Sequence, residues 1–126
     1  MFGTLRDAAV QRIREVVVDP GVDARIDDLP NQFSDSGYDA WGFHPEWAKW
    51  SLSLVRHIYE QYFRVETHGI EHVPDGRVLL IANHGGQLPL DGMLVASSLA
   101  LERNPPRAVR AQVEKWFPTL PVLSTF

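Results

Sequence analysis

The chain has 126 residues, enough for one domain, and 44% of them are hydrophobic, which is enough for a modest core. Its net charge of −4 gives no reason to expect a nucleic-acid partner, and the absence of cysteine excludes disulfides and thiolate chemistry and fits a reducing compartment. No apolar run approaches the roughly 18 residues of a membrane span, and no signal peptide is visible, so we expect a cytoplasmic location.

Residues 1–43 are predicted to form an N-terminal helix and an acidic linker. Apolar residues at helical spacing predict an amphipathic helix over residues 4–18, which the following Asp-Pro-Gly turn ends. We expect this helix to dock on the rest of the chain, and a membrane surface or a partner protein is the alternative. Residues 19–43 are rich in aspartate and in turn-forming residues, which indicates a linker.

The clearest helical pattern covers residues 44–63. Pro45 suits the first turn, Glu46 favours the positive end of the helix dipole, and apolar and aromatic residues share one face. We favour core packing for these aromatic side chains. Anchoring at a membrane interface is the alternative, because Trp and Tyr prefer the headgroup level.

Three short segments are predicted to be β-strands, over residues 63–67, 77–82 and 107–113. The middle segment contains five consecutive apolar residues, too few for a helix and typical of a strand that is buried on both faces. Residues 89–103, rich in Ala, Leu and Ser, are predicted to form the helix that follows it.

Several site classes are excluded by the residues present. His68 and His72 have the spacing of a helical zinc site, but Gly69 breaks a helix there and no third ligand is near, so we expect no metal. An α/β-hydrolase would need a Gly-x-Ser-x-Gly elbow, and a Walker loop would need Lys followed by Ser or Thr after its glycines. Neither occurs.

The main candidate site lies in the loop that follows the middle strand. His84 is in a glycine loop, and Asp91 opens the next helix. In open α/β sheets, ligands bind at this end of a strand. A neutral imidazole can take a proton from an alcohol when a carboxylate holds its other nitrogen. The spacing alone is equally compatible with a loop histidine and a carboxylate that stabilises the helix N-terminus.

The sequence ANHGGQLPLDG over residues 82–92 resembles the first sequence block of the glycerolipid (lysophospholipid) acyltransferase family, in which Asn-His is followed by Asp. Residues 63–74 resemble the strand and the Gly-x-Glu-x-x-Pro approach that precede that block. The family usually has four residues between His and Asp, whereas this chain has six. Two later family blocks, one with an Arg for the acceptor phosphate and one with Pro-Glu-Gly, are absent.

This resemblance, over roughly residues 60–126, implies an α/β fold in which N-terminal helices precede the first strands and helices of an acyltransferase-like sheet. Residues 44–126 would be the N-terminal part of that domain, and the missing blocks predict an incomplete sheet that a second chain could complete. A non-catalytic lipid-binding or partner-binding fragment of the same fold is the alternative.

The implied reaction is acyl transfer from acyl-CoA or an acyl-carrier protein to a hydroxyl of a glycerolipid-type acceptor, with no cofactor. His84 would be the general base and Asp91 its orienting partner. Loop N–H groups would stabilise the oxyanion. The expected substrate-binding residues are Asn83, Gly85, Gly86 and Gln87. A lipid acceptor also implies peripheral contact with a membrane.

Overall fold

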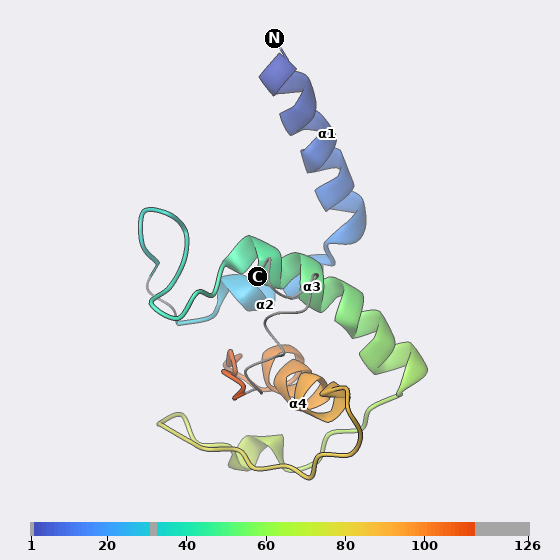
Figure 1. Ribbon diagram of the computed structural model, residues 1–126, viewed down its shortest axis with the longest axis vertical. Coiled ribbons are helices and arrows are strands. Elements are labelled where there is room, and N and C mark those ends of the chain that lie inside the picture. The colour runs from blue at the N-terminus through green and yellow to red at the C-terminus, as the bar shows by residue number, and fades with distance from the viewer. Residues whose placement is uncertain (1, 31–32, 113–126) are drawn as a thin grey trace.

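The computed structural model describes residues 2–30 and 33–112, and the regular elements in this part of the chain are all helical (Figure 1). The α-helices are α1 (Phe2–Val17), α2 (Pro20–Asp27), α3 (Pro45–His57) and α4 (Leu90–Leu101). A π-helical turn, η1 (Ile58–Tyr62), continues α3, and a 3₁₀ turn, η2 (Ile70–His72), follows it. The end of the predicted third strand and the segment after it, residues 113–126, lie outside the described residues.

The predicted α/β sheet is wrong, because no β-strand occurs in residues 2–30 and 33–112. The apolar run that was expected to be a buried strand is exposed instead, with Leu79 at 78% and Ile81 at 87%. Strand pairing requires a second segment to satisfy the backbone groups. Among the described residues, the backbone of residues 77–82 makes no such pairing. The other expected strands, 63–67 and 107–112, are likewise irregular.

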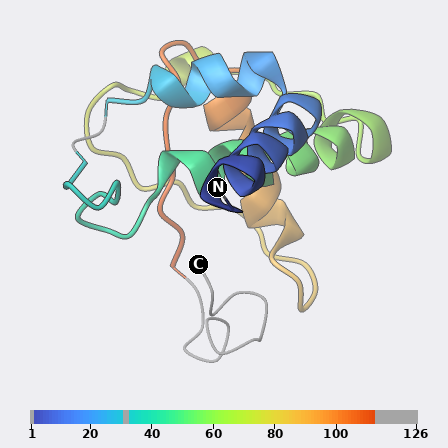
Figure 2. The ribbon, with the colours of Figure 1, turned by 90° about the horizontal axis from the view of Figure 1, so that it is seen from above.

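The core lies where α2, α3 and α4 meet. Its buried residues are Val22, Ile26, Leu29, Leu52 and Ala100. Figure 2, seen from above, shows the long segment between η1 and α4 passing around the outside of these helices. The acyltransferase-like sheet is therefore replaced, in the described residues, by a small helical packing unit.

Helix α2 falls inside the segment that was predicted to be a linker. Asp19 caps it, because its Oδ1 accepts hydrogen bonds from the N–H groups of Gly21 (2.8 Å) and Val22 (3.1 Å), and Pro20 occupies the first turn. Val22 and Ile26, one turn apart, are buried. The aspartates of this segment thus cap and flank a helix.

The predicted helix over residues 44–63 is confirmed as α3 and η1. The predicted packing of its aromatic residues in the core is confirmed only in part. Tyr59 is buried, whereas Tyr62 and Trp47 are exposed. Trp41, in the loop before the helix, is also exposed. Helical spacing predicts which residues share a face of the helix. How much of that face is buried depends on the neighbouring elements.

Helix α1 extends away from the other helices (Figure 1). The expected docking occurs only near its C-terminal end, where Val18, just after the helix, is buried. The apolar residues Val10, Ile13 and Val16 remain largely exposed.

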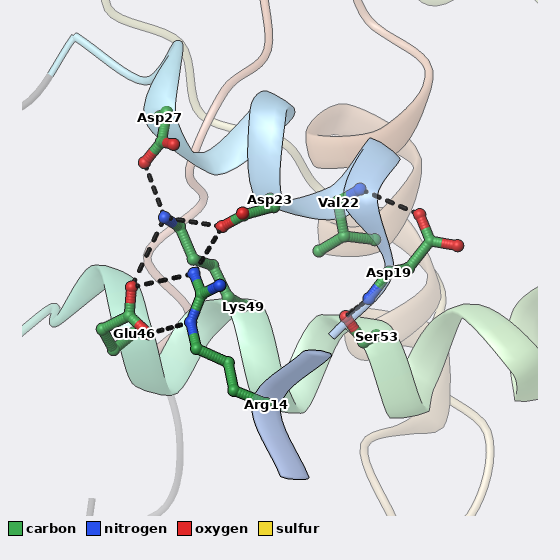
Figure 3. A network of polar contacts seen from close by, with 8 residues as sticks. All are labelled: Arg14, Asp19, Val22, Asp23, Asp27, Glu46, Lys49 and Ser53. Carbon is green, nitrogen blue, oxygen red and sulfur yellow. Dashed lines mark hydrogen bonds and ion pairs between the residues drawn. The ribbon is translucent and has the colours of Figure 1, made fainter. Parts of the chain in front are cut away.

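A polar network joins α1, α2 and α3 (Figure 3). The Lys49 side chain is only 7% exposed, and its Nζ lies 2.7 Å from both Asp23 Oδ1 and Asp27 Oδ1. Arg14 reaches the same cluster from α1, with Nη2 2.7 Å from Asp23 Oδ1 and Nε 2.8 Å from Glu46 Oε2. A buried ammonium needs such partners, because an unpaired charge away from water is strongly destabilising.

This network should make the fold sensitive to acid. The hydrogen bond from Lys49 lowers the pKa of Asp23, and the hydrogen bond from Arg14 lowers the pKa of Glu46. Both groups therefore stabilise the fold above the ordinary carboxyl pKa of about 4, and this contribution is lost as the pH falls through their lower folded-state values. Thermal unfolding followed by circular dichroism should give a stable plateau from pH 7 to about 5 and a decline below about 4. Asp23→Asn should flatten the decline, and an unchanged slope in that variant would contradict the assignment.

Partly buried hydrogen bonds hold the segment that leads to the candidate site. Arg103 is buried and donates to the Val73 carbonyl (2.9 Å) and to Asp75 Oδ1 (2.6 Å). The Tyr59 hydroxyl lies 2.8 Å from Thr67 Oγ1 and donates to Glu102. Burial raises the pKa of Tyr59 to about 12, so this hydroxyl keeps its proton near neutral pH. These contacts tie both ends of residues 67–75 to the helices.

Candidate active site

His84 and Asp91 come from different elements. His84 lies in the irregular loop that follows the apolar segment, and Asp91 lies in the first turn of α4. The buried residues near the C-terminal end of α4, among them Leu99 and Ala100, anchor that helix to the core. The carboxylate is therefore carried by a packed element, whereas the imidazole is carried by an exposed loop.

The structure brings these two side chains into contact. His84 Nδ1 lies 2.9 Å from Asp91 Oδ2 and 3.0 Å from Oδ1. A carboxylate in this position accepts the Nδ1–H and leaves Nε2 as the basic nitrogen. The His84 side chain is 55% exposed, and within residues 2–30 and 33–112 Nε2 makes no hydrogen bond. The imidazole is thus oriented and open to a ligand.

Two backbone amides also hold Asp91. The Gly85 N–H donates to Oδ2 at 3.0 Å, and the Gly92 N–H donates to Oδ1 at 2.7 Å. These hydrogen bonds, that of Gly85 first, together with His84 keep the pKa of Asp91 below its usual range. The carboxylate is therefore ionised near neutral pH and can stabilise a positively charged imidazole.

The six-residue spacing is accommodated by a wide loop. Gly86 has φ +101°, a conformation that is accessible to glycine and strained for other residues. The Leu90 N–H then donates to the Leu88 carbonyl at 2.8 Å, just before α4 begins. The six residues between His84 and Asp91 therefore do not separate the imidazole from the carboxylate.

Of the other predicted residues in this loop, Gly85 is hydrogen-bonded to Asp91, and in the part of the chain that the structure describes the other three make no hydrogen bond to the His84–Asp91 pair. Asn83, Gly86 and Gln87 are exposed. The Gly85 N–H is already bonded to Asp91, so the loop N–H groups that remain for an oxyanion are those of Gly86 and Gln87. The contribution of Gly92 was not predicted, although a carboxylate in the first turn of a helix commonly accepts backbone N–H groups there.

An apolar cavity of about 220 Å³ lies between α2, α3 and α4. Met93, two residues after Asp91, lines it together with Ala96 and Ser97 of the same helix. Ile81, Leu88 and Leu90, which flank the loop in sequence, are exposed. Sequence periodicity did not indicate this cavity, because its walls come from three separate helices and from residues outside them, among them Phe43 and Ala108.

The described residues contain neither a metal-binding cluster nor a membrane-spanning helix. There, no cluster of three or more His, Cys, Asp or Glu side chains could hold a metal ion. No helix in residues 2–30 and 33–112 combines the length and the apolar character that crossing a membrane requires.

Comparisons with known proteins give relatives without an assigned activity. No protein-family model matches the chain, and no solved structure matches it. The chain is similar to the uncharacterized proteins Rv0502 of Mycobacterium tuberculosis, Mb0514 of Mycobacterium bovis and ML2427 of Mycobacterium leprae, with 34% identity over 91 residues in each case. The match covers 71% of this chain and 25% of each relative, so the chain spans about a quarter of the length of the curated relatives it matches.

Proposed function

We propose that this protein transfers an acyl group from a thioester to the hydroxyl of a lipid acceptor. The observation that carries the proposal is the 2.9 Å contact between His84 Nδ1 and Asp91 Oδ2 in an exposed glycine loop. The resemblance of residues 82–92 to the first acyltransferase block supports the same reaction. Acyl-CoA or an acyl-carrier protein is the proposed donor.

The proposed reaction needs one base and no covalent acyl-enzyme. His84 Nε2 takes the proton of the acceptor hydroxyl while that oxygen attacks the carbonyl carbon of the thioester. The intermediate then breaks its C–S bond, and the leaving thiolate receives the proton from His84. Asp91 stays ionised and stabilises the imidazolium that forms between these steps. The N–H groups of Gly86 and Gln87 are the proposed donors to the oxyanion.

An amphiphilic substrate suits the surroundings of the site. The exposed apolar side chains of Ile81, Leu88 and Leu90 support contact with a lipid surface. We propose that the protein acts while bound peripherally to a membrane.

A lipid-binding function without catalysis is the second candidate. The exposed apolar residues of α1, among them Ile13 and Val16, favour it, because a helix with such a face can lie on a membrane surface. The two candidates differ in one respect that can be measured, since only the first releases a thiol from the donor.

The test is an assay of the full-length polypeptide with labelled acyl-CoA and three acceptors: glycerol 3-phosphate, a lysophospholipid and a long-chain alcohol. We expect free CoA and an acylated product in equal amounts with at least one acceptor. The chain contributes no thiol background to a CoA assay, because it contains no cysteine. Binding to lipid vesicles without CoA release from any acceptor would favour the second candidate and reject acyl transfer.

A further inference from the structure

We propose that the backbone N–H of Gly85 is a positioning group that holds the Asp91 carboxylate against His84 and thereby keeps Nε2 as the basic nitrogen. Its catalytic consequence rests on the proposed function, whereas its effect on His84 can be measured without any activity. This assignment differs from the role expected from the sequence, in which the Gly85 N–H contacts the substrate.

Both oxygens of the Asp91 carboxylate accept hydrogen bonds from backbone N–H groups. Oδ2 is the oxygen nearer to His84 Nδ1, and the same oxygen accepts the Gly85 N–H at 3.0 Å. Oδ1 accepts the Gly92 N–H at 2.7 Å. Because both oxygens are held by the backbone, the carboxylate cannot rotate freely away from the imidazole.

Exposure explains why such a hold is needed. The side chains of His84 and Asp91 are 55% and 29% exposed, and a charged contact that is open to water contributes little free energy to hold its own geometry. The loop between them is also two residues longer than is usual in the family that it resembles. Gly85 directly follows His84, so its N–H links the backbone beside the base to the carboxylate on α4.

The conformation of Gly85 identifies the N–H as the relevant feature. A Cβ placed on Gly85 would meet no atom within 4 Å, and its φ lies outside the positive range that favours glycine. Gly86, in contrast, requires glycine because its φ is +101°. An alanine at position 85 should therefore leave the contact intact, whereas removal of the N–H should break it.

The experiment compares three changes at position 85 in the full-length polypeptide. Gly85→Ala keeps the N–H, Gly85→Pro removes it, and replacement of Gly85 by glycolic acid turns the amide into an ester with little change in shape. The ester variant decides the outcome if proline, which also restricts the backbone of His84, displaces the imidazole. Circular dichroism checks that the helical content is retained.

The first readout is nuclear magnetic resonance of the side chains. In the wild type and in Gly85→Ala we expect the ring nitrogens of His84 to show one tautomer, protonated at Nδ1. In the ester and proline variants we expect a mixture of tautomers, and the pKa of Asp91 should rise towards its ordinary value. The second readout is kinetic, with kcat about 10- to 100-fold lower in these two variants and KM unchanged, as for other groups that orient a functional histidine.

Two results would overturn the inference. One is a single Nδ1-protonated tautomer in the ester variant, and the other is a mixture of tautomers in Gly85→Ala, which would indicate a steric effect. Failure of the proposed function is a separate result. If the wild type transfers no acyl group while the ester variant loses the tautomer preference, then the positioning role stands and the acyl-transfer proposal falls.

Discussion

Replacing His84 with Gln is expected to lower kcat for acyl transfer by about 10²- to 10⁴-fold, the usual contribution of a general base. A glutamine amide can still donate and accept hydrogen bonds, but it cannot take a proton from the acceptor hydroxyl. Stability should change little, because the His84 side chain is largely exposed and its recorded hydrogen bonds are those to Asp91. The measurement is CoA release under saturating donor and acceptor.

A matched control is available on the same segment of the chain. The side chain of His68 is 86% exposed, and it lies outside the candidate site. His68→Gln should therefore keep wild-type kcat and KM. If His84→Gln also kept full activity, then His84 would not be the base and the proposed mechanism would be rejected.

The two members of the pair should act as one unit. Asp91→Asn should lower kcat strongly, because an amide can stabilise the wrong tautomer of His84. In the double variant with His84→Gln, kcat should fall by about the same factor as in His84→Gln alone, because Asp91 then has no imidazole to orient. Losses that multiply in the double variant would indicate that Asp91 acts independently of His84.

The parts of the fold that could be predicted from the sequence are those with local signals. The spacing of apolar residues and Pro45 predicted the helix that became α3 and η1, and the Ala- and Leu-rich segment predicted α4. These local signals could not decide whether the expected β-sheet forms. Five apolar residues in a row indicate burial, but a strand depends on a pairing segment elsewhere in the chain, which the run itself does not specify.

In the candidate site, too, the sequence predicts some contacts and not others. The contact between His84 and Asp91, expected from residue types and spacing, is present, and its catalytic role stays a prediction. The hydrogen bond from Gly85 to the carboxylate could not be predicted, because glycine contributes only its backbone there and the loop conformation decides where that backbone points. The hydrogen bond from Gly92 has a local signal, because a carboxylate in the first turn of a helix commonly accepts backbone N–H groups.

The largest stability effect is expected at Lys49, where Lys49→Met should lower the free energy of unfolding by about 1–3 kcal/mol. Methionine keeps the apolar stem but removes the charge that Asp23 and Asp27 share at 2.7 Å. Since those carboxylates are partly exposed, the loss should be smaller than for a fully buried ion pair. Urea unfolding at pH 7 measures it.

Arg56→Met is the matched control for this prediction. Arg56 also bridges two acidic residues, Asp19 and Glu60, but its side chain is 31% exposed, so its removal should cost less than about 1 kcal/mol. Adding Asp27→Asn to Lys49→Met should restore part of the lost stability, because a carboxylate left without its ammonium is then removed. If Lys49→Met were as stable as the wild type, or if Asp27→Asn gave no recovery, then apolar packing rather than the charge cluster would hold α2 against α3.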